Sequence, residues 1–247
     1  MLVLPATVGL AACGSSSHHA AATGASGTGA AHERHAAGTP LTRQQATALA
    51  SAVNLTSVDV PGFTATVKHE GKTAAERRVE QDVRRCAGSA ASHKTVVQIS
   101  SKDFERHQSI AAQSVSSEVT VAATAAQAAG ELAAVRSPHV RGCLAHYLEV
   151  LFKNQRAVGA RVEHVSIMQG TPPAPGASGS FGWRMTAMFS VRGFAIPIYL
   201  DLLGFTYGPV EVSLVSTGLP EPLPAAIEER LFTLLVSRVE AYRPSPL

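Results

Sequence analysis

The feature that most constrains the fold is a series of strand-like segments in the C-terminal half, the last three of which are separated by short turns. These segments are rich in β-branched, aromatic and aliphatic residues and cover 160–168, 183–191, 195–205 and 210–214. Arg192-Gly193 lies between the second and third of them, and 207–209 lies between the third and fourth. Turns this short join antiparallel neighbours. We therefore predict an antiparallel sheet.

Helical patterns surround these strands. Apolar residues three or four positions apart predict helices at 42–53, 73–85, 122–135, 143–155 and 225–242. Shorter strands are expected at 63–67, 95–99 and 116–121. In the last of these, Val119 and Val121 point inward while Glu118 and Thr120 point outward. Ser101 to Phe104 reads as a turn that leads into a polar stretch. Together these elements predict an α+β domain, an antiparallel sheet with helices packed on one face.

The composition is compatible with one such domain and excludes a nucleic-acid-binding role. Hydrophobic residues make up 45% of the chain but aromatic residues only 5%, so Ala, Val and Leu must fill the core. The net charge is +3, and the densest basic group, Arg77-Arg78 with Arg84-Arg85, is interspersed with acidic residues. Such a group is typical of a solvated helix face. No basic stripe with interleaved aromatic residues is present, so no nucleic-acid partner is expected.

The N-terminal sequence indicates where the protein is found. An apolar run at 2–8 leads into Leu10-Ala11-Ala12-Cys13, and Gly-Ser-Ser-Ser follows. This order resembles the lipobox of bacterial lipoproteins, in which the chain is cut before the cysteine and its sulfur carries a diacylglycerol. The resemblance implies a signal segment at 1–12, a lipid on Cys13 and an extracytoplasmic, membrane-anchored domain. The alternative is an ordinary secretory signal, in which the residue after the cleavage site is immaterial.

Residues 13–40 are expected to form a flexible tether, followed by a single domain at 41–247. The segment after Cys13 consists mainly of Ser, Gly, Ala, Thr and His, and it lacks the apolar surface that would offset its ordering entropy. Four of its residues are histidines, at His18, His19, His32 and His35. A polar linker is the favoured interpretation, and a metal-handling arm is the alternative. The histidine spacing is not that of a zinc-hydrolase helix, so no metal site or cofactor is expected.

The number of cysteines favours one disulfide. The chain has three, and a lipid on Cys13 leaves Cys86 and Cys143 as an even pair. Outside the cytoplasm such a pair normally oxidises. The bridge would close a loop of nearly sixty residues, which stabilises by roughly 4 kcal/mol on the chain-entropy account. Two buried free thiols are the alternative.

No catalytic motif is present, so the chain is expected not to be an enzyme. The sequence contains no Gly-x-Ser-x-Gly elbow, no phosphate-binding Gly-rich loop after a strand and no Cys-x-x-Cys. An extracellular hydrolase whose site is invisible in the sequence remains the alternative.

Two neighbouring strands carry the candidate ligand-binding residues. Trp183 and Arg184 lie in one strand, and Tyr199 and Asp201 lie in the next. In a hairpin about Arg192-Gly193, Arg184 comes to lie near Asp201, and the two side chains can pair across the sheet. One interpretation is a polar wall of a ligand cleft. The other is an exposed ion pair worth about 0.2–1 kcal/mol, with Trp183 as a core anchor.

Several short motifs follow one another in an order that resembles a known family. They are Asp59 to Phe63, a helix ending at Cys86, Ser101 to Phe104, Ser116 to Val119, and a Cys-Leu pair at Cys143. The order resembles the extracellular sensor domain of PknH-type mycobacterial receptor kinases and the related actinobacterial lipoproteins. The resemblance implies a helix-flanked antiparallel sheet around a ligand cleft. It suggests a sensor-like domain that binds a small molecule, a lipid or a protein partner.

Overall fold

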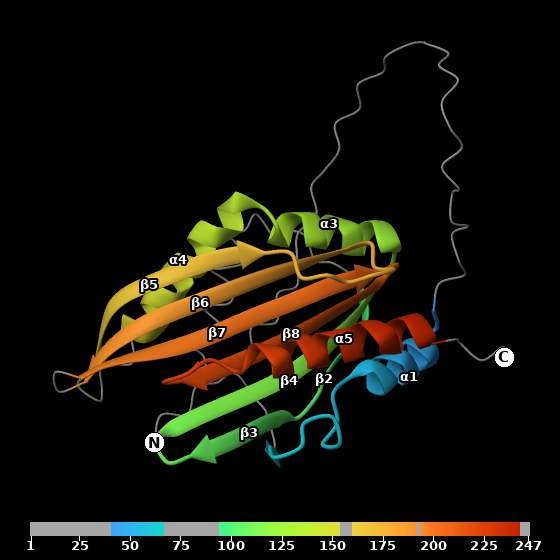
Figure 1. Cartoon of the computed structure of the whole chain (residues 1–247). Coiled ribbons are helices and arrows are strands. Elements are labelled where there is room, and N and C mark those ends of the chain that lie inside the picture. The colour runs from blue at the N-terminus through green and yellow to red at the C-terminus, as the bar shows by residue number, and fades with distance from the viewer. Residues whose placement is uncertain (1–40, 67–93, 154–159, 192–193, 243–247) are drawn as a thin grey trace, which may run out of the picture.

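The computed structural model describes residues 41–66, 94–153, 160–191 and 194–242 (Figure 1). The helices in these ranges are α1 (Arg43–Val53), α3 (Ala125–Val135), α4 (Pro138–Lys153) and α5 (Ala225–Ala241). The strands are β1 (Thr64–Thr66), β2 (Thr95–Ser100), β3 (Asp103–Gln108), β4 (Ala111–Ala122), β5 (Ala160–Gly170), β6 (Gly179–Val191), β7 (Phe194–Tyr207) and β8 (Val210–Leu219). All strand pairs are antiparallel, which confirms the predicted α+β class.

The strands form one sheet, in which β4 pairs with three other strands. Their order is β1-β3-β4-β8-β7-β6-β5, with β2 also paired to β4. One edge of β4 pairs with β8 from Ala112↔Leu219 to Val121↔Val210. The other edge pairs with β3 along its first half and with β2 along its second half. Strands β5 to β8 form a meander in which each strand pairs with the next.

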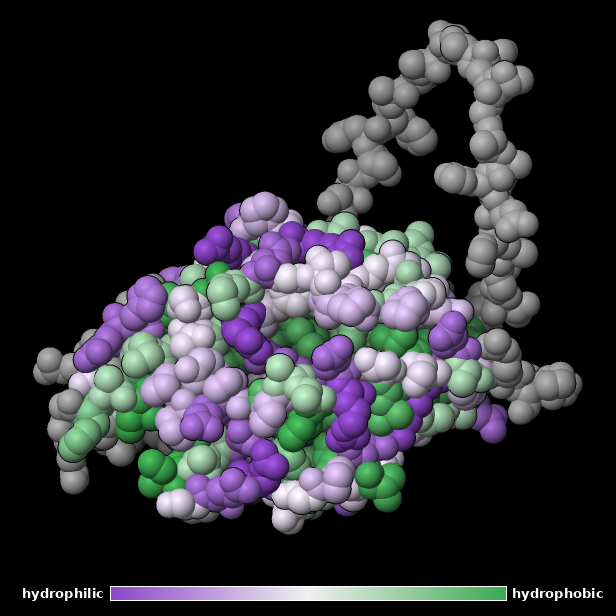
Figure 2. All heavy atoms as spheres, in the orientation of Figure 1, coloured by the Kyte–Doolittle hydropathy of each residue, from purple (hydrophilic) through white to green (hydrophobic). Residues whose placement is uncertain are grey.

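Helices cover both faces of this sheet, whereas the sequence predicted helices on one face only. Helices α1 and α5 lie side by side on the near face in Figure 1, and α3 and α4 lie on the far face. Two clusters of buried apolar side chains correspond to these layers, one beneath α1 and α5 and one beneath α4. The outer surface of the near face mixes hydrophilic and hydrophobic side chains without a broad apolar patch (Figure 2).

Helix α1 begins as its sequence predicts. The Thr42 hydroxyl accepts a hydrogen bond from the Gln45 amide at 3.2 Å, and the Gln45 side chain accepts one from the Thr42 amide at 3.0 Å. This capping box satisfies two of the amide donors that every helix start leaves open. Four apolar residues of the helix, spaced three or four positions apart as the predicted pattern requires, are buried: Ala46, Leu49, Ala50 and Val53.

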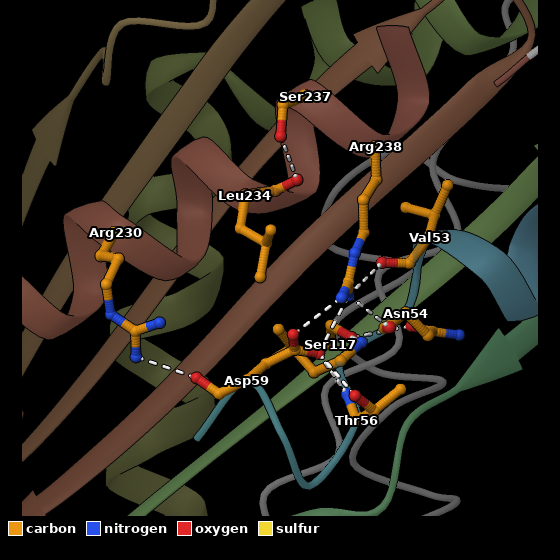
Figure 3. A network of polar contacts seen from close by, with 10 residues as sticks. Val53, Asn54, Thr56, Asp59, Ser117, Arg230, Leu234, Ser237 and Arg238 are labelled. Atoms are coloured by element: carbon orange, nitrogen blue, oxygen red, sulfur yellow. Dashed lines mark hydrogen bonds and ion pairs between the residues drawn. The ribbon is translucent and has the colours of Figure 1, made fainter. Parts of the chain in front are cut away.

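A polar network joins the end of α1 to α5 (Figure 3). Arg238 of α5 donates to both carboxylate oxygens of Asp59, at 2.7 and 3.0 Å, and to the Asn54 carbonyl at 3.0 Å. Burial alone would raise the pKa of Asp59, but hydrogen bonds from Arg238 and Thr56 outweigh it and hold that pKa below its usual value. The Asn54 side chain is bound in turn by the Ser117 hydroxyl at 2.7 Å. The network fixes α5 against the N-terminal part of the domain.

Several predicted elements differ in extent from the observed ones. The polar stretch after Ser101 is a strand, β3, because its backbone pairs with β1 and β4 although its side chains are mostly polar. Helix α4 begins at Pro138 rather than at Cys143, since proline is well suited to the first helical position. The helix predicted at 73–85, together with the signal segment and the tether, lies outside the described residues.

Candidate functional site

The ion pair predicted between Arg184 and Asp201 is present. Arg184 of β6 lies directly opposite Asp201 of β7. Its Nε and Nη2 donate to Oδ1 and Oδ2 of the carboxylate, each at 2.7 Å. The Asp201 side chain is only 2% exposed, against 39% for Arg184. The pair is therefore a two-point, half-buried contact, which differs from the exposed ion pair of the second interpretation.

The first turn of α5 completes this polar cluster. Glu228 of α5 lies 3.4 Å from Nη2 of Arg184, and its other carboxylate oxygen accepts a 2.8 Å hydrogen bond from Ser216 of β8. Burial raises the pKa of Glu228, and the charge of nearby Asp201 raises it further. Each of these side chains has a protein partner, so the cluster serves to hold α5 on the sheet.

Trp183 is separated from the other three predicted ligand-binding residues. Adjacent residues in a strand point to opposite faces, so Trp183 packs beneath α4 while Arg184 lies on the α5 side. Trp183 is 0% exposed, which confirms its role as a core anchor. Tyr199 and Asp201 are two positions apart in β7 and share the α5 side. The four residues therefore do not line one cavity, and a role for them in ligand binding stays a prediction.

A cavity lies between α3 and the sheet, on the face of the sheet opposite to α5. Its volume is about 50 Å³, and we call it the α3 cavity. Three acidic side chains line it from three elements: Glu118 of β4, Glu131 of α3 and Glu211 of β8. Thr206 of β7 lies at the same level of the sheet, directly opposite Glu211. Apolar side chains complete the wall, among them Leu132, Val135, Phe181 and Leu202.

Two glycines allow this cavity to form. A Cβ on Gly204 would lie 2.3 Å from the ring of Phe181, so the missing side chain lets that ring lie against the sheet beside the cavity. A Cβ on Gly179 would lie 2.9 Å from both Leu132 and Arg136 of the α3 segment. The absence of a side chain there lets α3 approach closely. Arg136 then anchors the end of the helix by donating to the Ser180 carbonyl from Nε at 2.8 Å.

Glu211, one of the three carboxyl groups in the cavity, has a strongly raised pKa. Burial, a hydrogen bond to Glu131 and the charges of Glu131 and Glu118 together raise this pKa to about 9. Glu211 is therefore protonated at neutral pH and donates a hydrogen bond to Glu131. Two other groups bind the neighbouring carboxylates: Gln127 donates to Glu131 at 2.9 Å, and the Ser100 hydroxyl donates to Glu118 at 2.8 Å. Ionisable groups with strongly shifted pKa values in a concave site are typical of functional sites.

Two polar atoms in the wall of the α3 cavity have no hydrogen-bond partner among the described residues. They are Oγ1 of Thr206 and Oε1 of Glu211. The Thr206 residue is only 3% exposed. A buried hydroxyl or carboxyl oxygen without a partner costs about 1–3 kcal/mol, and nearly all such groups in native proteins are satisfied. A small polar ligand in the cavity would satisfy both atoms.

The remaining predicted sites are not brought into this cavity. Cys143 is buried in α4, but Cys86 and Cys13 lie outside the described residues, so the disulfide and the lipid stay predictions. The histidines of the tether also lie outside them. Within the described ranges no group of three or more His, Cys, Asp or Glu side chains is arranged to hold a metal ion. No helix in these ranges is long and apolar enough to cross a membrane.

No local pattern in the sequence indicates the α3 cavity. Alternation correctly separated Glu118 from the apolar face of its strand, but it assigned that glutamate to solvent. Glu131 lies in an Ala-rich helix whose position on the sheet the pattern does not specify. The cavity could have been predicted only by combining two inferences. Acidic residues of two strands had to point to the same face of the sheet, and a second layer of helices had to cover that face.

Comparisons with known proteins give little further information. No family model and no curated protein matches the sequence. One similar solved structure is the extracellular domain of PknH from Mycobacterium tuberculosis, at 12% sequence identity and a TM-score of 0.37. The match covers 83% of this chain and 99% of that one. It is a weak likeness in overall fold to the kind of domain that the short motifs resemble.

Proposed function

We propose that the protein is an extracytoplasmic lipoprotein whose folded domain binds a small polar ligand in the α3 cavity without catalysing a reaction. The observation that carries the binding role is the pair of buried, unpartnered oxygens of Thr206 and Glu211 in a cavity of about 50 Å³. Native proteins rarely leave such atoms unsatisfied, so the arrangement is suited to a ligand that provides hydrogen-bond donors.

The lining residues favour binding over catalysis. In the described part of the chain they include no histidine, cysteine or lysine, the side chains that most often act as base or nucleophile. The carboxyl groups of Glu131 and Glu211 are hydrogen-bonded to each other. Paired glycosidase carboxyls stand about 5 Å or more apart, so this pair is too close for that chemistry.

Binding can be tested without knowing the natural ligand. A panel of amines, carboxylates, polyols and zwitterions of up to about five heavy atoms is titrated into isotopically labelled protein. Binding predicts chemical-shift changes at the amides of Thr120, Thr206 and Glu211. The single tryptophan, Trp183, does not line the cavity, and its indole signal serves as an internal control. The binding role is wrong if no compound shifts the amide signals of the cavity residues. It is also wrong if every compound that binds shifts only the signals of residues outside the cavity.

The anchoring part of the proposal rests on the lipobox-like sequence that ends at Cys13. We expect mass spectrometry of membrane-extracted protein to find an acylated N-terminal cysteine. A Cys13→Ala variant should remain unacylated and leave the membrane fraction. An unmodified Cys13 in mature protein would contradict the anchor and leave the binding role unaffected.

A bridge between Cys86 and Cys143 belongs to the same proposal, because an oxidising compartment favours it. Burial of Cys143, which is 1% exposed, is compatible with a paired sulfur. Alkylation of the unfolded, unreduced protein should modify neither cysteine, and reduction should expose both. Modification of either one without reduction would contradict the pairing.

A further inference from the structure

The charge balance of the α3 cavity indicates which ligands it can accept. Its titratable groups are Glu118, Glu131 and Glu211, and no lysine, arginine or histidine of the described residues lines it. The buried Thr206 hydroxyl, 3% exposed and without a partner, faces the same space. Every unsatisfied oxygen there can accept a hydrogen bond. The matching ligand carries positive charge and several N–H donors.

We propose that the α3 cavity binds a primary ammonium group, with Thr206 Oγ1 and Glu211 Oε1 accepting two of its three N–H donors. This inference rests on the proposed ligand-binding function and names the ligand class. An alkylammonium group is a compact charge with three donors, as in the lysine side chain. Glu118 and Glu131 would place further negative charge beside it.

The size and the apolar wall of the cavity agree with such a group. A volume of about 50 Å³ holds on the order of four water-sized spheres, enough for an ammonium nitrogen and two or three further heavy atoms. Leu132, Phe181 and Leu202 line the cavity and offer an apolar surface to a methylene stem. A quaternary ammonium group lacks N–H donors and is larger, so it would leave the two oxygens unsatisfied.

A divalent metal ion fits this site less well. Calcium requires six to eight oxygen ligands and magnesium requires octahedral geometry. Among the described residues no cluster of acidic or imidazole side chains meets the requirements of a metal site. An ammonium group needs only hydrogen-bond acceptors with a net negative charge, which the cavity provides.

Binding should release a proton. Free protein holds a proton on Glu211, because burial, the hydrogen bond to Glu131 and the charges of Glu131 and Glu118 raise its pKa to about 9. A bound ammonium favours the ionised carboxylate, so the proton leaves to solvent as the ion pair forms. Between about pH 6 and pH 8 the affinity should therefore rise up to tenfold per pH unit.

Isothermal titration calorimetry with ethanolamine, at pH 7 and in two buffers of different ionisation enthalpy, tests both claims. Ethylene glycol and glycolate serve as neutral and anionic analogues of similar size. We expect ethanolamine to bind with release of about one proton, and the two analogues to bind at least about tenfold more weakly. Tighter binding of either analogue at the cavity amides would overturn the ammonium assignment and leave the small-ligand function standing. Absence of binding by every compound would overturn both.

Two variants with matched controls locate the site. Thr206→Val and Glu211→Gln should each weaken ethanolamine binding about tenfold, and Glu211→Gln should also abolish the proton release. Thr186→Val, at a half-buried position of β6, and Glu163→Gln, at an exposed position of β5, should change neither quantity. Equal affinity in Thr206→Val and Thr186→Val would overturn the assignment. Thermal unfolding confirms that each variant is folded.

The ammonium group can come from a free amine or from a lipid headgroup, and vesicles separate the two. Co-sedimentation with vesicles of phosphatidylcholine, with and without phosphatidylethanolamine, is measured for the wild type and Thr206→Val. Binding that needs phosphatidylethanolamine and the Thr206 hydroxyl indicates the headgroup. Binding of free ethanolamine without vesicle binding indicates a small soluble amine. Vesicle binding that persists equally in Thr206→Val, with no ethanolamine binding, would contradict the proposed site.

Discussion

Replacing Glu211 with glutamine should make the protein progressively more stable, relative to wild type, as the pH rises. The wild-type carboxyl has its pKa raised from the ordinary 4.5 to about 9, so the folded state binds a proton that the unfolded state has lost. Its favourable contribution is complete below pH 4.5 and is lost as the pH rises towards 9. Glutamine keeps a donor for Glu131 but carries no proton to lose.

The size of the effect follows from the number of protons. Uptake of one full proton on folding lowers the free energy of unfolding by about 1.4 kcal/mol per pH unit. Between pH 5 and pH 8 the stability difference between Glu211→Gln and wild type should therefore grow by up to about 4 kcal/mol. Because Glu211 is partly exposed, we expect about half of this change. Even that is a large share of the 5–15 kcal/mol typical of a folded domain.

Urea unfolding at pH 5, 6, 7 and 8 measures this difference directly. Glu163→Gln is the matched control, because that residue is exposed on β5. The control should run parallel to wild type over the whole pH range, while Glu211→Gln should diverge upward. Parallel curves for all three proteins would mean that Glu211 titrates like an exposed carboxyl, and the α3 cavity would not be the shielded site described above.

Three further changes probe the same structure. Thr206→Val should raise the free energy of unfolding by about 1 kcal/mol in urea titrations, since it removes a buried hydroxyl without a partner; a loss of stability would mean that the hydroxyl is satisfied. Gly204→Ala should cost about 1–3 kcal/mol by displacing the aromatic ring beside it, whereas Gly130→Ala, at an open position of α3, should gain about 0.5–1 kcal/mol. A tolerated Gly204→Ala in thermal unfolding would contradict the close packing. Arg238→Met should lower the free energy of unfolding by about 3 kcal/mol at neutral pH, because it leaves the Asp59 carboxylate without its counter-charge. This loss should shrink in acid as Asp59 becomes protonated. A constant loss between pH 3 and pH 7 would refute this account.

Local patterns in the sequence predicted the elements of the fold well. The α1 helix and its four buried residues follow from spacing, because a helix presents every third or fourth residue to one side. The β6–β7 hairpin and its Arg184–Asp201 pair follow in the same way from a short turn and the pleat. The fold class could therefore be derived without any tertiary information.

What the sequence did not predict depends on how layers stack. Alternation placed Glu118 and Thr120 on the side of β4 opposite the valines, but it does not tell whether that side meets water or a helix. In the structure α3 covers it. Strand β3 was missed because its side chains are mostly polar and the strand is defined by pairing with distant neighbours. The candidate site shares this property, since its residues are distant in sequence.

The pairing of β4 with β8 connects chain segments about a hundred residues apart, whereas β5 to β8 join through successive hairpins. Pairings this distant in sequence slow the folding of a chain, because the loop they close is entropically costly. The α3 cavity takes Glu118 and Thr120 from one side of this junction and Glu211 and Ser213 from the other. Only a chain that has completed this slow step possesses the site. An occupant bridging the two strands would retard their separation and lengthen the lifetime of the native state.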